Sequence, residues 1–146
     1  MGAIRILLDS NSYFRLARSI RPLLNSEFGA NKRYCLYVIR EMESEFRKNP
    51  RLQRKFHWVS APEFVLNRSK AIRIDKAEKQ SLTQVRDFID NHARVEGLGV
   101  SRIDVAALAT AYALGIQLVT DDQEMLALAR DFEIATLTTL ELLKLM

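Results

Sequence analysis

Short apolar runs that alternate with helix-length segments constrain the fold of this chain more than any other feature. We expect strands over residues 3–8, 34–38, 117–120 and 133–136, and a helix-length pattern follows each of them. A chain that passes through a helix between strands favours parallel βαβ units with right-handed crossovers. The sequence therefore predicts an α/β fold with a mainly parallel central sheet.

The expected helices differ in how clearly the sequence marks their ends. Asn49-Pro50 breaks one pattern, and Gly97 and Gly99 end another. The stretch between Pro50 and Arg68 is poorly patterned, so we expect only a mixture of helix and loop there. The predicted helices cover residues 10–19, a short piece after Pro22, 40–48, 75–94, a helix that begins at Ser101, 122–130 and 138–143.

Length and composition favour one cytoplasmic domain. The chain has 146 residues, of which 48% are hydrophobic, and no linker divides it, so we expect a single domain over residues 1–146. No apolar run approaches the roughly 18 residues of a membrane span, and the first residues lack the layout of a signal peptide. The single cysteine, Cys35, lies in an apolar run, which indicates a buried thiol in a reducing compartment.

The charges are distributed unevenly along the chain. Residues 1–80 carry 17 Lys and Arg against 8 Asp and Glu, whereas residues 81–146 carry 5 against 10. The basic half is therefore the candidate for phosphate contact. Its densest stretch contains Arg47, Lys48, Arg51, Arg54 and Lys55. The alternative is a solvated amphipathic helix, with Leu52 and Phe56 as its buried stripe.

Acidic residues stand where predicted strands end and helices begin. Asp9 closes the first strand and Asp122 follows the strand near residue 118, so both fall at the carboxyl edge of the sheet, where α/β folds bind ligands. Glu45 lies on the predicted helix over residues 40–48, and Asp104 lies on the predicted helix that begins at Ser101. Carboxylates gathered at one edge repel one another unless they bind protons or a hard cation, which predicts a Mg²⁺ or Mn²⁺ site.

Helix capping is the competing explanation for these carboxylates. Asp104 stands three residues after Ser101, and Asp121 stands three before Glu124, as in capping boxes. Asp9 could also cap the helix that begins near residue 10. On the helix over residues 40–48, spacing alone does not choose among Glu41, Glu43 and Glu45.

Four motifs resemble those of the PIN domain, and in particular the small VapC-type toxin ribonucleases. A strand ends in Asp within residues 7–12, and a strand runs into a helix with a Glu before a large apolar residue within 37–46. An Asp opens an Ala-rich helix within 101–111, and a strand ends in Thr-x-Asp within 118–122. These motifs occur in the family's order and span most of the chain.

The resemblance implies a three-layer α/β/α sandwich and a metal-dependent endoribonuclease, the toxin of a toxin–antitoxin pair. It implies that Asp9, Glu45, Asp104 and Asp122 are the catalytic and metal-binding residues, with Mg²⁺ or Mn²⁺ as the cofactor. By register the fourth acidic residue is Asp122, and Asp121 is then expected to be a helix cap. The implied partners are an RNA substrate, a small antitoxin and a second copy of the chain.

Two other functions fit parts of the sequence. A PIN fold can serve as a non-catalytic nucleic-acid-binding or scaffold protein. Phosphatases of the haloacid dehalogenase type also begin with a strand that ends in Asp. They need a second Asp two residues later, where this chain has Asn11.

Overall fold

A five-stranded, mainly parallel sheet forms the centre of the computed structural model, which describes residues 2–146. The strand order is β2-β3-β1-β4-β5, and only the β2–β3 pair is antiparallel. The α/β fold predicted from the sequence is therefore confirmed. The strands are β1 (Ile4–Leu8), β2 (Glu27–Phe28), β3 (Tyr34–Tyr37), β4 (Gln117–Val119) and β5 (Thr136–Leu137).

Strand β1 lies in the middle of the sheet and sets the register of its neighbours. Leu7 pairs with Tyr37 of β3 on one side and with Leu118 of β4 on the other. Leu7 is completely buried, as expected for a strand that helices cover on both faces. Because β1, β3 and β4 are parallel, their carboxyl ends meet at the same edge of the sheet.

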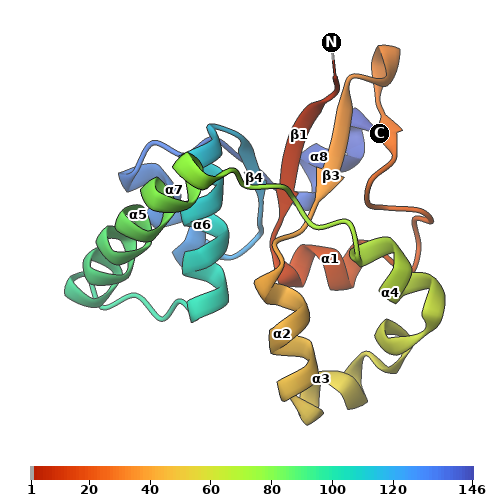
Figure 1. The fold of residues 1–146 in the computed structure, drawn as a ribbon, viewed down its shortest axis with the longest axis horizontal. Coiled ribbons are helices and arrows are strands. Elements are labelled where there is room, and N and C mark those ends of the chain that lie inside the picture. The colour runs from red at the N-terminus through yellow and green to blue at the C-terminus, as the bar shows by residue number, and fades with distance from the viewer. Residues whose placement is uncertain (1) are drawn as a thin grey trace.

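The helices cover the sheet from two sides. Figure 1 shows α5, α6 and α7 grouped on one side of the strands, with α1 and α4 on the other. Within residues 2–146, no helix is both long and apolar enough to cross a bilayer. The helices are α1 (Ser10–Leu16), α2 (Glu41–Lys48), α3 (Pro50–Lys55), α4 (Pro62–Arg68), α5 (Lys76–Val95), α6 (Arg102–Leu114), α7 (Gln123–Asp131) and α8 (Thr139–Leu145).

Helix α6 forms the packed centre of one helical layer. Every residue from Val105 to Ala111 is buried, and the small alanine side chains let α6 pack closely against α5 and the sheet. Ser101 caps its first turn in a capping box with Asp104, as the sequence predicted. Gly115 ends the helix in the left-handed conformation, at φ 64°.

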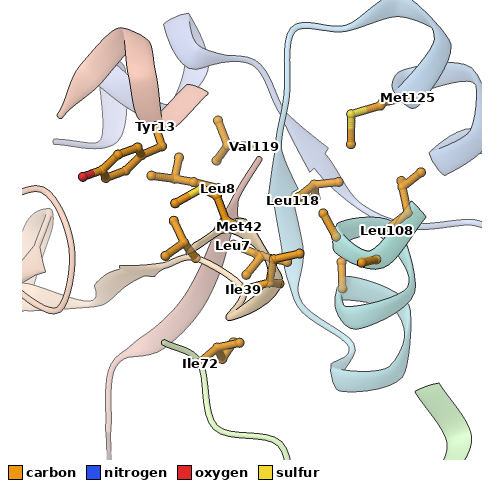
Figure 2. Close-up of a cluster of buried hydrophobic side chains, with 14 of the residues drawn as sticks. Leu7, Leu8, Tyr13, Ile39, Met42, Ile72, Leu108, Leu118, Val119 and Met125 are labelled. Carbon is orange, nitrogen blue, oxygen red and sulfur yellow. The ribbon is translucent and has the colours of Figure 1, made fainter. Parts of the chain in front are cut away.

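The core joins the sheet to both helical layers. Figure 2 shows side chains from β1 and β4 beside Met42 of α2 and Leu108 of α6. Leu108 and Leu118 are completely buried, and burial of one such side chain contributes roughly 1.5–3 kcal/mol. Met42 places α2 against the end of β1, next to the edge that carries the acidic residues.

Two sequence-based predictions of local structure were wrong. The expected helix after Pro22 does not form, because Asn67 bonds both the N–H and the carbonyl of Leu24 and so holds this segment in an irregular conformation. The expected strand over 133–136 forms instead at Thr136–Leu137. Helix α7 runs on to Asp131 and Glu133 takes a left-handed φ of 56°, which delays the start of the strand.

Candidate functional site

Asp9 and Asp122 lie at the shared carboxyl edge of β1 and β4. Leu8 and Val119 pair at the ends of these strands, and the Asp9 N–H donates to the Val119 carbonyl at 3.1 Å. Asp9 is 3% exposed, and its Oδ1 accepts a hydrogen bond from the Ser12 N–H at 2.8 Å. Asp9 is therefore both the N-cap of α1 and an acidic group at the ligand-binding edge of the sheet.

Glu45 and Asp104 approach this edge from helices. Glu45 lies on α2 and Asp104 in the first turn of α6, and these two helices contact each other. Both side chains are partly buried. Asp104 also lines one small recess together with Asp9 and Met42, so the first helical turn of α6 stands beside the end of β1.

Burial and mutual repulsion raise the pKa of three of these carboxyl groups. Burial is the main cause that raises the pKa of Asp9, and the charge of Asp104 adds to it, although hydrogen bonds with Ser12 and Thr120 oppose the shift. Burial likewise raises the pKa of Glu45, with a further contribution from Asp104.

Asp104 links the four acidic residues electrostatically. Burial raises its own pKa first, hydrogen bonds with Ser101 oppose this, and the charge of Asp122 raises the pKa further. Asp9, Glu45 and Asp122 thus each interact with Asp104. Within residues 2–146, however, no three His, Cys, Asp or Glu side chains are gathered closely enough to hold one metal ion. The structure brings the four residues to one region, but their carboxylates do not converge on one point.

The donor set is compatible with a hard divalent cation. Carboxylate oxygens are the ligands that Mg²⁺ and Mn²⁺ prefer, and a cation would offset the burial of the negative charges at Asp9 and Asp104. The two histidines stand apart from this region: His92 bonds Asp131 at 2.9 Å, and His57 lies beyond α3. The residue types present therefore suit an oxygen-coordinated ion, although their carboxylates do not converge.

The structure corrects the roles of the two adjacent aspartates. Asp122, not Asp121, is the N-cap of α7, and its Oδ1 accepts from the Met125 N–H at 3.0 Å. Asp121 accepts bonds of 2.9 and 2.7 Å from the N–H and hydroxyl of Thr139, and it pairs with Arg15 at 2.7 Å. Asp121 therefore links the loop after β4 to α8 through Thr139 and to α1 through Arg15.

The pKa of Asp121 reflects these bonds. Burial raises it, but the hydrogen bonds from Thr139 and the charge of Arg15 outweigh burial, so the pKa lies below its ordinary value. Asp121 stays ionised beside Asp122. Sequence spacing missed this because both partners are distant in the chain.

Arg68 is a second feature that the sequence did not reveal. Its guanidinium makes two bonds to Glu43, at 2.6 and 3.0 Å, and a third to the Tyr13 hydroxyl at 3.0 Å. The Arg68 side chain is 2% exposed, and it lies over the rings of Tyr13 and Phe46. The hydrogen bond from Arg68 is the main cause that lowers the pKa of Glu43. This group fixes α4 and α1 to α2, the helix that carries Glu45.

The basic stretch covers the end of α2 and the whole of α3. Helix α2 ends at Lys48, and Asn49 caps α3, which Pro50 begins. Leu52 and Phe56 are partly buried, as the amphipathic interpretation predicted.

Comparisons with known proteins identify the fold. No family model matches the sequence, and no curated protein matches it either. Among solved structures, FitAcB from Neisseria gonorrhoeae is 17% identical with a TM-score of 0.55, over 92% of this chain and 98% of the other. PAE2754 from Pyrobaculum aerophilum is 21% identical with a TM-score of 0.56, over 98% and 96%.

A third structure is VapBC2 from Rickettsia felis, bound to a promoter DNA fragment. It is 13% identical with a TM-score of 0.56, over 92% of this chain and 98% of the other. These similarities establish that the chain shares the α/β fold of these three structures. They confirm the α/β fold that the four motifs predicted, and membership of the VapC-type PIN family stays a prediction.

Proposed function

We propose that this protein is a metal-dependent endoribonuclease and the toxin of a toxin–antitoxin pair. The observation that carries the proposal is the burial of Asp9, Glu45 and Asp104 at one sheet edge, where each pKa is raised. Burying several like charges is unfavourable unless a cation or protons neutralise them. Such a cost favours a functional site over separate structural roles, since capping accounts for Asp9 and Asp104 but not for Glu45, which lies within α2.

Asp9, Glu45 and Asp104 would hold Mg²⁺ or Mn²⁺, with Asp122 as a fourth ligand or as an acceptor for a bound water. A divalent ion at such a site lowers the pKa of a water molecule and neutralises charge on a phosphodiester. Asp9 is held in place by its bond from Ser12, and Asp104 by its capping box. These bonds hold Asp9 and Asp104 in place, and the carboxylates would have to move closer together to share one ion.

The proposed partners rest on the resemblance of the four motifs to VapC-type toxins and on the fold comparison. VapBC2 in the Rickettsia structure is bound to a fragment of promoter DNA. By analogy we propose a small antitoxin as the partner of this chain, single-stranded RNA as its substrate and a homodimer as its assembly.

The alternative is a non-catalytic PIN-fold protein that binds nucleic acid or serves as a scaffold. The observation in its favour is that, over residues 2–146, the carboxylates do not yet converge on one point. It predicts RNA or partner binding without cleavage, whatever the divalent ion.

Asp9→Asn tests the proposal against the capping role alone. Asn is as good a helix cap as Asp, so the variant should fold but lose at least about 100-fold in Mn²⁺-dependent RNA cleavage. The matched control is Asp75→Asn, because Asp75 caps α5 in the same way, accepting from the Glu78 N–H at 2.7 Å. Asp75→Asn should cleave like the wild type.

Cleavage is measured on single-stranded RNA with Mn²⁺, Mg²⁺ or EDTA, and folding by thermal melts. Full activity of Asp9→Asn would refute the assignment of Asp9. An inactive wild type that still binds RNA would favour the scaffold alternative.

A further inference from the structure

Two hollows flank the acidic residues. The first, of about 450 Å³, lies between α1, the end of α3 and the loop after β4, and its lining includes Asn11, Lys55, Phe56 and Asp122. The second, of about 510 Å³, includes Glu45 and Lys48 in its lining. Both volumes fall in the range of small-molecule sites, and one could hold a single nucleotide. The acidic residues therefore have a cation-bearing hollow on either side.

The first hollow combines a cation with an aromatic surface. The Phe56 ring stacks on Phe14, with 4.4 Å between the ring centroids and an interplanar angle of 11°. This contact holds the Phe56 ring in place. Lys55 Nζ lies 5.4 Å from the centroid of the Phe56 ring. Within residues 2–146, Lys55 makes no ion pair, whereas Arg15 of the same hollow is paired with Asp121. Lys55 is thus the cation available to a ligand.

The charges of this hollow select one kind of ligand. Lys55 attracts an anionic group, while Asp122, which also lines the hollow, repels one unless a cation intervenes. A nucleic-acid strand suits this hollow, since it offers a phosphate to Lys55 and the π face of a base to the Phe56 ring. An unpaired base is required, because the bases of a duplex are already stacked.

The same geometry separates the basic residues of this region into two groups. Lys48 and Lys55 line the hollows beside the acidic residues. Arg47, Arg51 and Arg54 are exposed and line neither hollow. The five cations of the basic stretch are therefore not equivalent.

We propose that Lys55 and Phe56 form a nucleotide subsite for single-stranded RNA, next to the phosphate that the acidic residues would face. This inference rests on the proposed nuclease function and specifies how the substrate lies: Lys55 contacts a phosphate, and Phe56 stacks on the adjoining base. The strand then runs over the acidic edge towards Lys48. Stacking on phenylalanine accepts any base, so this subsite recognises single strands without reading sequence.

The first test compares Lys55→Ala with Arg54→Ala. Both variants remove one exposed positive charge from the end of the same helix, so they change the net charge equally. Binding of a short single-stranded RNA is measured against ionic strength, in Ca²⁺ to suppress cleavage. Lys55→Ala should weaken binding about 10-fold and reduce the salt slope by about one unit, whereas Arg54→Ala should stay within about twofold of the wild type.

The second test examines stacking with Phe56→Leu, which keeps an apolar side chain against Phe14. The probe is the same RNA with one abasic position, moved along the strand. One such position should weaken wild-type binding about fivefold or more and should have no effect on Phe56→Leu, since the stacking partner is already missing.

Cleavage kinetics distinguish failure of the subsite from failure of the proposed function. Lys55→Ala should raise KM and leave kcat nearly unchanged, because a phosphate contact outside the scissile bond acts equally in ground and transition states. If wild-type protein cleaves RNA but Lys55→Ala and Arg54→Ala bind alike, the subsite is wrong and the nuclease stands. If Lys55→Ala loses RNA binding in a protein that never cleaves, the subsite stands and the nuclease is wrong. Unchanged RNA binding with loss of antitoxin binding would assign the hollow to the protein partner and overturn the subsite.

Discussion

Replacing Arg68 with Met should destabilise the protein by about 3 kcal/mol. The variant keeps most of the aliphatic stem but removes the guanidinium that bonds Glu43 and Tyr13. Loss of one partner from a buried ion pair costs about 3–5 kcal/mol, because the remaining charge is left without compensation. The Glu43 side chain is 28% exposed and regains some water, so we expect the lower end of that range.

The assay is thermal and urea unfolding, with an exposed pair as the control. For a domain of this size, 3 kcal/mol corresponds to a fall in Tm of about 10 °C. Arg94 pairs with Asp90 on the surface of α5, with side-chain exposures of 76% and 48%. Arg94→Met should therefore cost less than about 0.5 kcal/mol.

A double variant separates the unpaired charge from the pair itself. Arg68→Met with Glu43→Met should recover much of the loss, because apolar replacement of a whole buried pair is often close to neutral. If Arg68→Met lowers Tm no more than Arg94→Met, the pair is not a structural anchor. The attachment of α4 to α2 must then depend on apolar contacts alone.

Three further outcomes follow from the carboxylates. Millimolar Mn²⁺ should raise the Tm of wild-type protein, by an amount equivalent to about 2.7 kcal/mol at 100 times Kd, and calorimetry without binding would contradict the site. In metal-free buffer, burial holds the pKa of Asp9 above 3.8, so the free energy of unfolding should fall as pH rises above that value. Asp9→Asn should remove this part of the fall, and equal pH profiles of Tm for wild type and variant would refute the prediction. Asp121→Ala, which loses bonds to Thr139 and Arg15, should cost about 1–2 kcal/mol, measured by urea unfolding. The control is Glu133→Ala, because the Glu133 carboxylate makes no hydrogen bond or ion pair within residues 2–146.

Local sequence patterns predicted the parts of the fold that local physics determines. The strands β1, β3 and β4 and the start of α6 at Ser101 are confirmed, because apolar periodicity and capping depend on residues a few positions apart. The helix predicted after Pro22 was wrong because Asn67, more than 40 residues away, bonds that backbone. Distant partners of this kind leave no local signal.

The candidate site shows the same division. Spacing after β1 and β4 placed Asp9 and Asp122 at one edge, and the sheet confirms that placement. The cap assigned to Asp121 was wrong, because its partner Thr139 belongs to another helix. Nothing in the sequence indicated the buried ion pair of Arg68, since an arginine in the basic half of the chain is expected to be exposed at the surface. The catalytic role of the four acidic residues stays a prediction.

The order of the strands in the sheet has a consequence for synthesis of the protein. Strand β1 is made before its neighbour β4, which comes from residues 117–119, so the edge between them forms only after residue 119 has left the ribosome. A nascent or prematurely ended chain carries Asp9 and Glu45 but lacks Asp122. A role that needs Asp122 beside Asp9 is therefore absent until β4 has been made and has paired with β1.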